Sequence, residues 1–131
     1  MSAPALKGLS VRQPWAWAIA TGLKPVENRT WRTHYRGPIV LHASQRYDRE
    51  GEVWMRQVMG LDVPADLPRG GIVGWARLYD CVEAYASPWF FGPYGFVFTE
   101  PQGLAFTPLR GRLGLFDVSA ARLGVRPSEV L

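Results

Sequence analysis

The side chains best suited to chemistry are grouped between Leu9 and Ser44. Lys24 and Glu27 stand three residues apart where a helix end is expected to meet a strand, so both side chains can point into one cleft. A lysine beside a carboxylate stays charged and can hold a phosphate, whereas a desolvated lysine can act as a base or nucleophile. The alternative is a surface ion pair, which contributes little. Lys24 and Glu27 are therefore the first candidates for a catalytic or ligand-binding pair.

The residues that follow predict a strand over 26–31 with two different faces. Its alternation places Glu27, Arg29 and Trp31 on one face, and Asn28 on the other. A carboxylate, a guanidinium and an indole together can bind and stack a flat ligand. The alternative is an internal pair between Glu27 and Arg29, with Trp31 in the core. Asn28 and Arg29 are both candidates for ligand binding.

A short helix is predicted from Pro14 to Gly22, and polar and aromatic candidates stand at its start. Trp15 shares a helix face with apolar residues and is expected in the core, whereas Trp17 lies off that face and is a candidate for stacking on a base. Gln13 either caps the helix or bonds to a base edge. Arg12 precedes it, and we expect both residues to border the cleft.

His42 belongs to a predicted strand over 39–44 that alternates between two faces. One face carries Ile39, Leu41 and Ala43, and the other carries Val40, His42 and Ser44. As a general base His42 suits ribonuclease chemistry, in which a 2′-hydroxyl is deprotonated and a cation such as Lys24 or Arg36 holds the phosphate. A hydrogen-bonded structural histidine is the alternative. Ser44 lacks a glycine-rich nucleophile elbow, so it is a ligand-binding candidate only.

Aromatic residues are dense in the loop over 84–93. Trp89, Phe90 and Phe91 follow one another there, and they form either a wall of the binding cleft or a hydrophobic plug at one end of the fold. The loop therefore adds Trp89 to the candidate binding residues.

All but two of the 15 basic residues are arginine, and the net charge is +4. Guanidinium groups bind phosphate and stack on bases, so the composition favours an anionic partner; a GC-rich genome is the alternative explanation. A phosphate track beside the cleft is predicted, with a solvated surface as the alternative; its arginines are Arg32, Arg36, Arg46, Arg49 and Arg56, extended by Arg110 and Arg112.

The length of 131 residues predicts a single domain over 1–131. One cysteine, Cys81, excludes an internal disulfide, and two histidines argue against zinc, so we expect no metal and no cofactor. We find no apolar run that predicts a membrane span and no apolar signal core at the N-terminus, which makes the cytoplasm the expected location, with no membrane partner.

Glycine (14 residues) and proline (11 residues) favour many turns and short strands. A second helix is predicted over 47–61 with Asp48 as its N-cap, and a short helix follows Ser119. Further strands are predicted over 6–12, 72–82, 94–99, 104–108 and 113–118. Gly74 within a strand indicates a bulge or a close approach. Strands with two or three inserted helices imply an α+β fold around a small, strongly curved sheet or barrel.

Several segments resemble the ASCH family (activating signal cointegrator homology) of the PUA-like superfamily. They are Leu9-Ser10-Val11-Arg12-Gln13-Pro14-Trp15-Ala16, Gly22-Leu23-Lys24-Pro25-Val26-Glu27-Asn28-Arg29-Thr30-Trp31, Arg36-Gly37-Pro38, His42-Ala43-Ser44, Gly71-Ile72-Val73-Gly74, Asp80-Cys81-Val82 and Gly92-Pro93-Tyr94-Gly95-Phe96. The resemblance implies a PUA-like mixed β-barrel with two or three helices and a cleft beside the first helix. It also implies a link to RNA, DNA or modified nucleosides.

The family includes nucleic-acid binders, ribonucleases and amidohydrolases that act on N4-acylated cytidine. The amidohydrolases use a lysine, a threonine three positions later and a distant glutamate. Lys24 matches the lysine, Glu27 replaces the threonine, and no acid between Trp89 and Phe96 matches the glutamate. The departure favours binding over catalysis.

The sequence therefore predicts a nucleic-acid-binding domain in which RNA, single-stranded nucleic acid or a modified nucleoside occupies a cleft of Lys24, Glu27, Asn28, Arg29 and His42. The alternative is a hydrolase of the same family, an amidohydrolase or ribonuclease, that uses Lys24 and Glu27 with His42 as a tentative third catalytic residue. A module that binds a small molecule or a protein partner is a third interpretation.

Overall fold

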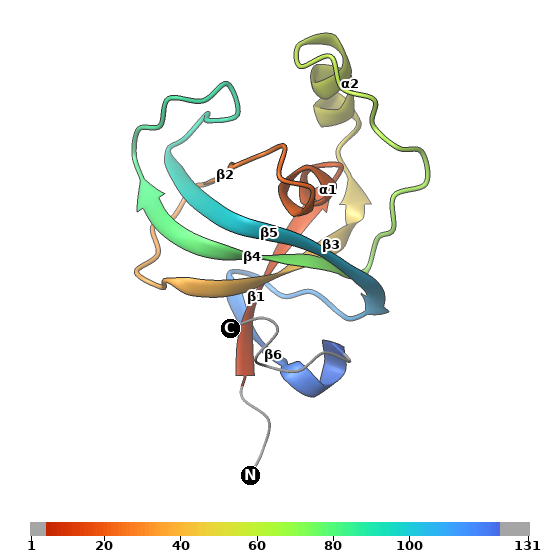
Figure 1. The fold of residues 1–131 in the computed structure, drawn as a ribbon, viewed down its shortest axis with the longest axis vertical. Coiled ribbons are helices and arrows are strands. Elements are labelled where there is room, and N and C mark those ends of the chain that lie inside the picture. Colours follow the sequence, from red (N-terminus) through yellow and green to blue (C-terminus); the bar gives the residue numbers. More distant parts are fainter. Residues whose placement is uncertain (1–4, 124–131) are drawn as a thin grey trace.

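The computed structural model describes residues 5–123 as one six-stranded mixed sheet with two α-helices (Figure 1). The strands are β1 (Ala5–Gln13), β2 (Val26–Arg29), β3 (Gly37–Tyr47), β4 (Gly71–Val82), β5 (Tyr94–Pro108) and β6 (Leu115–Ser119). The helices are α1 (Trp15–Ala20), α2 (Arg49–Gln57) and the 3₁₀-helix η1 (Ala120–Leu123). The strand order is β2-β5-β4-β3-β1-β6. The α+β prediction is confirmed.

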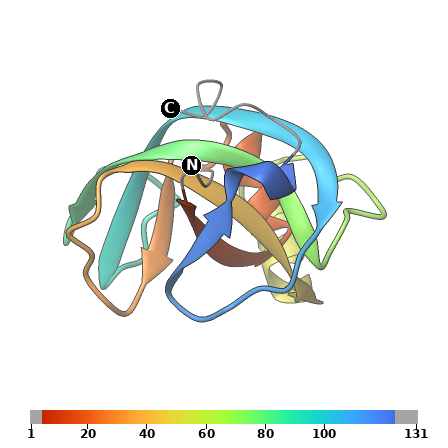
Figure 2. The same cartoon turned by 90° about the horizontal axis from the view of Figure 1, so that it is seen from below.

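The sheet is strongly curved, as the sequence predicts. β1 and β3 run parallel, and the other neighbouring pairs are antiparallel. In Figure 2, β4 (green) and β5 (cyan) form an arch over the rest of the sheet. Within residues 5–123, β2 and β6 are the edge strands and no ladder joins them. The curvature is thus confirmed, but closure into a barrel is not.

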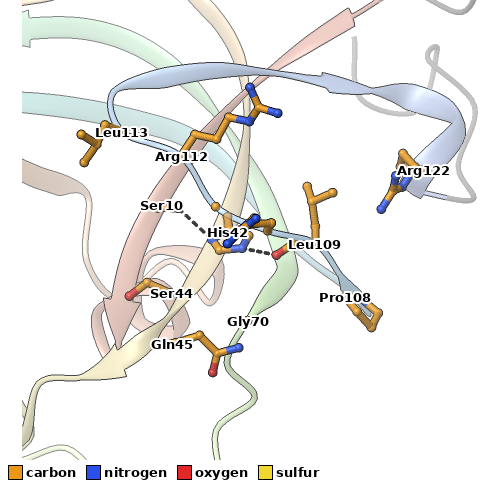
Figure 3. Close-up of a pocket in the computed structure, with 12 residues that line it drawn as sticks. Ser10, His42, Ser44, Gln45, Gly70, Pro108, Leu109, Arg112, Leu113 and Arg122 are labelled. Atoms are coloured by element: carbon orange, nitrogen blue, oxygen red, sulfur yellow. Dashed lines mark hydrogen bonds between the residues drawn. The ribbon is translucent and has the colours of Figure 1, made fainter.

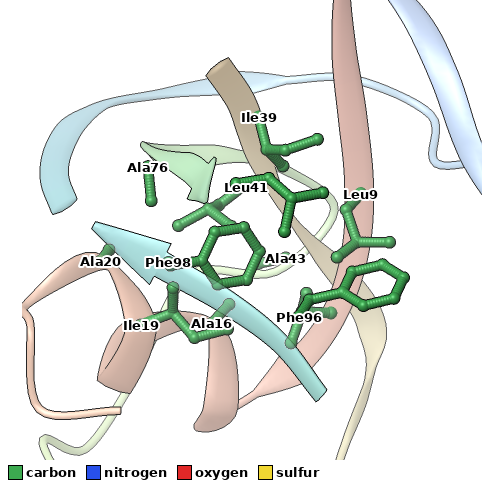
Figure 4. Packing of buried hydrophobic residues seen from close by; sticks show 12 residues of the cluster. Leu9, Ala16, Ile19, Ala20, Ile39, Leu41, Ala43, Ala76, Phe96 and Phe98 are labelled. Atoms are coloured by element: carbon green, nitrogen blue, oxygen red, sulfur yellow. The ribbon is translucent and has the colours of Figure 1, made fainter. Parts of the chain in front are cut away.

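Helix α1 packs against one face of the sheet, and this contact forms the main core (Figure 4). The cluster includes Ala16, Ile19 and Ala20 from α1 with Leu9, Ile39, Leu41, Ala43, Ala76, Leu78, Phe96 and Phe98 from the strands. The alternation predicted for β3 is confirmed, because Val40 faces a second cluster with Leu6, Ile72, Trp75, Phe116 and Val118. His42 also points to that side, with its ring 6.1 Å from that of Phe116.

Several predicted elements have different bounds in the structure; the strand predicted over 26–31, for example, ends at Arg29. The helix predicted over 47–61 is shorter at both ends: β3 continues to Tyr47, and the helix ends at Gln57. Asp48 is its N-cap, as predicted, and accepts a hydrogen bond from the Gly51 N–H at 2.9 Å. The strands predicted over 94–99 and 104–108 are one strand, β5. Its Pro101 lies beyond the segment that pairs with β2, where a missing N–H costs no ladder hydrogen bond. The final helix begins one residue after Ser119, and the loose end predicted beyond it lies outside the described residues.

The close approach predicted at Gly74 is confirmed, and it involves the protein itself. A Cβ atom at Gly74 would lie 2.5 Å from the carbonyl oxygen of Gln102 and 2.9 Å from the Cβ of Ala20. Glycine therefore allows β5 and α1 to pack closely against β4 at this position. In residues 5–123 neither α-helix has the length and apolar character needed to cross a membrane.

Gly74→Ala is expected to destabilise the protein by about 2 kcal/mol, because the added methyl group overlaps a backbone oxygen that cannot move freely. The measurement is the free energy of urea unfolding. Gly103→Ala is the matched control, since a Cβ at Gly103 has no atom within 4 Å. Equal effects of the two substitutions would contradict the packing constraint at Gly74.

Candidate functional site

Two neighbouring cavities lie along the C-terminal half of β1 and the end of β3. The first chamber, of about 510 Å³, is lined by Arg12, Trp15, Glu27, Arg29 and Arg46. The second chamber, of about 820 Å³, is lined by His42, Gly70, Pro108, Leu109, Arg110, Gly111, Arg112 and Arg122 (Figure 3). Both chambers are also lined by Ser10, Ser44, Gln45 and Leu113. The two chambers therefore adjoin each other, and together we call them the cleft.

A buried chain of charged groups lies at the floor of the first chamber. Lys24 Nζ donates to Glu27 Oε1 at 2.5 Å and to the Val26 carbonyl oxygen at 2.6 Å. Arg29 Nη2 donates to Glu27 Oε2 at 3.0 Å and to the Ser10 carbonyl oxygen at 2.8 Å. Each carboxylate oxygen of Glu27 therefore has a cationic partner. The curvature of the sheet makes this possible, since it brings the edge strand β2 to β1.

The ionised form of Glu27 is favoured in this setting. Burial alone would raise the pKa of Glu27, but Lys24 and then Arg29 outweigh burial and hold the pKa below its ordinary value. Burial lowers the pKa of Lys24, and the attraction of Glu27 opposes this shift without cancelling it. The Trp15 ring, whose centroid is 5.5 Å from Lys24 Nζ, adds a cation–π contact.

Glu27 and Arg29 face the cleft, whereas Lys24 lies behind them. Lys24 is only 2% exposed and is not part of the lining of either chamber. A ligand in the first chamber therefore meets the carboxylate and the guanidinium first. The Nε of Arg29 is buried without a hydrogen-bond partner, so one donor of the site remains unused by the protein.

Ser10 and His42 form a hydrogen-bonded pair at the junction of the chambers, because the parallel register sets them side by side. His42 Nε2 is 2.6 Å from the Leu109 carbonyl oxygen, and Nδ1 is 2.8 Å from Ser10 Oγ. A carbonyl oxygen can only accept, so Nε2 carries a proton; in the neutral ring Nδ1 is then an acceptor, and the Ser10 hydroxyl donates to it. His42 is 2% exposed and both ring nitrogens are occupied. This geometry fits a hydrogen-bonded structural histidine better than a general base that is accessible to a substrate.

Six of the residues predicted for the site lie at the cleft or directly behind it. Arg12 and Arg29 line the first chamber with Glu27, His42 lines the second, and Ser44 lines both. Lys24 supports Glu27 from behind. Trp15, which was expected in the core, is half-buried: it lines the first chamber, and its indole N–H donates to Asp48 Oδ2 at 2.8 Å.

The structure does not bring the other predicted residues to the cleft. Gln13 is 1% exposed; its amide accepts from the Trp17 N–H and donates to the Pro68 carbonyl, so it caps α1. Arg36 bonds to the Thr33 and Tyr35 carbonyls and to Asp80. Neither side chain has a donor directed at the chambers.

The side chain of Asn28 forms its hydrogen bonds with the backbone of the aromatic loop and is not directed at the cleft. Its Oδ1 accepts from the N–H groups of Phe91 and Gly92, and its Nδ2 donates to the Trp89 carbonyl. Trp89 is 4% exposed and packs in one cluster with Trp17. Trp89 and Phe90 thus pack in a core cluster, Phe91 is exposed, and the loop forms no wall of either chamber.

In residues 5–123 most arginines of the cleft make no ion pair, whereas most of those outside it do; Arg49 and Arg69 outside the cleft and Arg29 within it are the exceptions. Arg32, Arg56 and Arg77 have carboxylate partners in Glu83, Glu52 and Glu100. In the part of the chain that the structure describes, five arginines of the cleft have no such partner: Arg12, Arg46, Arg110, Arg112 and Arg122. Of the seven arginines of the predicted track, Arg46, Arg110 and Arg112 line the cleft, and Arg49 lies outside both chambers. Arg32, Arg36 and Arg56 form ion pairs elsewhere.

Sequence reasoning missed Ser10, Gln45, Leu113 and Arg122. No local pattern marks Ser10, which reaches His42 only through the pairing of β1 with β3. The segment over 110–113, with arginines on both sides of a glycine and a leucine at its end, was the available signal for the second chamber.

The comparison with protein families identifies the family of the chain. The model of the ASCH domain matches residues 9–91. The chain belongs to the ASCH domain family. It is thereby a member of the PUA-like superfamily, as the resemblance of its segments implied. The match includes Ser10, Lys24, Glu27, Arg29 and His42, but it ends before the loop that borders the second chamber.

This ASCH domain is similar to part of a much longer curated protein. It is 32% identical over 119 residues to Activating signal cointegrator 1 of Homo sapiens, covering 79% of this chain and 20% of that protein. The identity to Activating signal cointegrator 1 of Mus musculus is 37% over 82 residues, covering 57% of this chain and 14% of that protein. The chain thus spans about a fifth or less of the length of these relatives.

Solved ASCH structures share the fold. The ASCH structure from Zymomonas mobilis has a TM-score of 0.57 and 16% identity, covering 88% of this chain and 89% of that chain. The Y47F mutant of the same Zymomonas mobilis protein gives the same TM-score and covers 91% of that chain. At this level of identity the likeness supports the architecture alone.

The pH dependence of stability tests the buried charges. Because the pKa of Glu27 is lower in the folded protein, the unfolded chain binds the proton first as the pH falls. The stabilisation is complete above about pH 5 and is lost as the pH falls through the ordinary carboxyl range towards the lowered folded pKa. Glu27→Gln should therefore show a smaller change in unfolding free energy between about pH 7 and pH 3 than the wild type.

Glu83→Gln serves as the control for this measurement, since its carboxylate is 68% exposed. It should follow the wild-type pH dependence, which chemical denaturation at several pH values records. If the unfolding free energies of Glu27→Gln and the wild type changed equally with pH, the Glu27 carboxylate would have an ordinary pKa in the folded protein.

Proposed function

We propose that this ASCH domain binds single-stranded nucleic acid, RNA or a strand with a modified nucleoside, in the cleft formed by the two chambers. The observation that supports the proposal is the set of unpaired arginines around the cleft. Cations without protein partners are available to phosphates, and their neutralisation of a nucleic-acid strand supplies most of the affinity in such complexes. Without an anionic ligand, the positive charges of these arginines repel one another and destabilise the folded protein.

The first chamber suits a base. Glu27 is held ionised and accepts hydrogen bonds, so it matches the amino group of a base such as cytosine. Arg29 beside it donates to ring or carbonyl acceptors on the same base edge. The half-buried Trp15 contributes an aromatic surface to the lining. The first chamber therefore suits a base edge that carries both a hydrogen-bond donor and an acceptor.

The geometry gives the hydrolase alternative less support. Lys24 Nζ is buried behind Glu27 and bonded to Val26, so it does not meet a ligand in the chamber. His42 has no free ring nitrogen.

We propose in addition that the whole chain is one domain and that its curved sheet corresponds to the PUA-like barrel.

Binding to single-stranded RNA should weaken steeply with salt. For a fluorescein-labelled oligouridylate of about ten nucleotides, titrated by fluorescence anisotropy, log K should fall with log salt by about 0.7 for each phosphate contact. The double substitution Arg46→Ala and Arg112→Ala removes two cations of the cleft and should reduce the slope by about 1.4. An affinity that is independent of salt would refute the proposal.

Arg32→Ala is the matched control for this experiment. Its guanidinium is paired with Glu83 at 3.3 Å and lies outside both chambers, so the slope should stay at the wild-type value. An equal loss of slope in Arg32→Ala would indicate a general charge effect without a defined cleft.

The domain is expected to release no acetate from N4-acetylcytidine, because the ammonium group of Lys24 is inaccessible to the amide. Acetate is measured by an enzyme-coupled assay over several hours at micromolar protein. Release that is lost in a folded Lys24→Met variant, with folding confirmed by circular dichroism, would establish the hydrolase instead.

A further inference from the structure

The segment between β5 and β6 is fixed at its base although it has no regular structure. The Leu109 N–H donates to the Gly70 carbonyl at 3.1 Å, and the Leu109 carbonyl accepts from His42. Gly111 packs directly over Ser10 and His42, since a Cβ there would lie 2.3 Å from Ser10 Oγ. The protein thus holds this segment firmly against the floor of the cleft.

The tip of the same segment presents a leucine to solvent. Leu113 is 99% exposed, and it lines both chambers. A single exposed leucine is ordinary on a protein surface. This one differs in its position, because it stands where the two chambers meet and follows directly after Arg110 to Arg112. In Figure 3, Leu113 and Arg122 lie on opposite sides of His42, at the two sides of the second chamber.

The chambers have the size for one nucleotide each. Cavities that bind compact organic ligands measure about 300–1,000 Å³, and both chambers fall in this range at about 510 and 820 Å³. They share the floor residues Ser10, Ser44 and Gln45. Leu113 is the fourth residue that lines both chambers, so a ligand that fills both lies beside it.

The charges on the two sides of Leu113 favour a phosphate on each side. Arg46 and Arg12 belong to the first chamber, and Arg110 and Arg112 to the second. In residues 5–123 these four side chains make no ion pair. An apolar side chain between two groups of cations suits a nucleic-acid strand in which two successive bases are unstacked. The cations then bind the phosphates of the continuous backbone.

We propose that the ligand is a strand of at least two nucleotides, with one base in each chamber, and that Leu113 inserts between the two successive bases as an apolar wedge. Inserted leucine side chains unstack bases in this way in other nucleic-acid complexes. The proposal rests on the proposed function and adds a ligand class to it, since a free nucleoside fills one chamber only. Leu113 lies outside residues 9–91, which the family model matches.

The test uses a 5′-phosphorylated dinucleotide of 2-aminopurine and adenine, whose fluorescence rises when the two bases separate. Wild-type protein should bind it more tightly than 2-aminopurine mononucleotide and raise its fluorescence. Leu113→Ala should abolish the rise and weaken dinucleotide binding about fivefold, the effect of losing partial burial of one leucine side chain. Mononucleotide binding should stay unchanged in this variant.

Leu23→Ala is the matched control, because Leu23 is 40% exposed and lines neither chamber. Leu113→Met should retain the fluorescence rise, since methionine is also apolar and of similar size. The wedge would be disproved if Leu113→Ala behaved like Leu23→Ala, or if the dinucleotide bound no better than the mononucleotide. In both cases salt-dependent binding of oligouridylate would still uphold the proposed function, whereas failure of every strand to bind would remove both.

Discussion

The contact on which the site depends is the buried chain from Lys24 through Glu27 and Arg29 to the Ser10 carbonyl. A lysine that is 2% exposed is costly unless its charge is compensated, and Glu27 together with the Val26 carbonyl supplies the compensation. Arg29 then uses the second oxygen of Glu27 and reaches β1. One set of polar contacts therefore joins an edge strand to the opposite part of a curved sheet, and fixes the floor of the first chamber.

This arrangement also determines the charge of the cleft. Glu27 is neutralised from two sides, so its carboxylate adds little negative potential to the rim of arginines around it. The carboxylate still has lone pairs for a ligand. The site therefore combines an overall positive field, which favours a phosphate backbone, with one defined acceptor that distinguishes between base edges. Specificity and attraction come from different groups.

Local patterns predicted the fold and the polar centre of the site. The alternation of β3 and the cap at Asp48 needed only neighbouring residues, and the spacing of Lys24, Glu27 and Arg29 placed them together. The remaining site depends on long-range pairing, which no local pattern reveals: β1 beside β3 joins Ser10 to His42. Gln13, Asn28 and Trp89 have chemistry suited to ligands, but backbone groups and core packing occupy them first.

The hydrogen bond between Ser10 and His42 limits which ligand groups can bind where the two chambers meet. The Ser10 hydroxyl has a single proton. When the imidazole is neutral, this proton is engaged in the hydrogen bond to Nδ1, because the Leu109 carbonyl fixes Nε2 as the donor. Ser10 Oγ therefore offers a passing ligand lone pairs only. Groups with a proton to give, such as a ribose 2′-hydroxyl or an amino group, find an acceptor at that point, while phosphate oxygens gain nothing there and are left to the arginines.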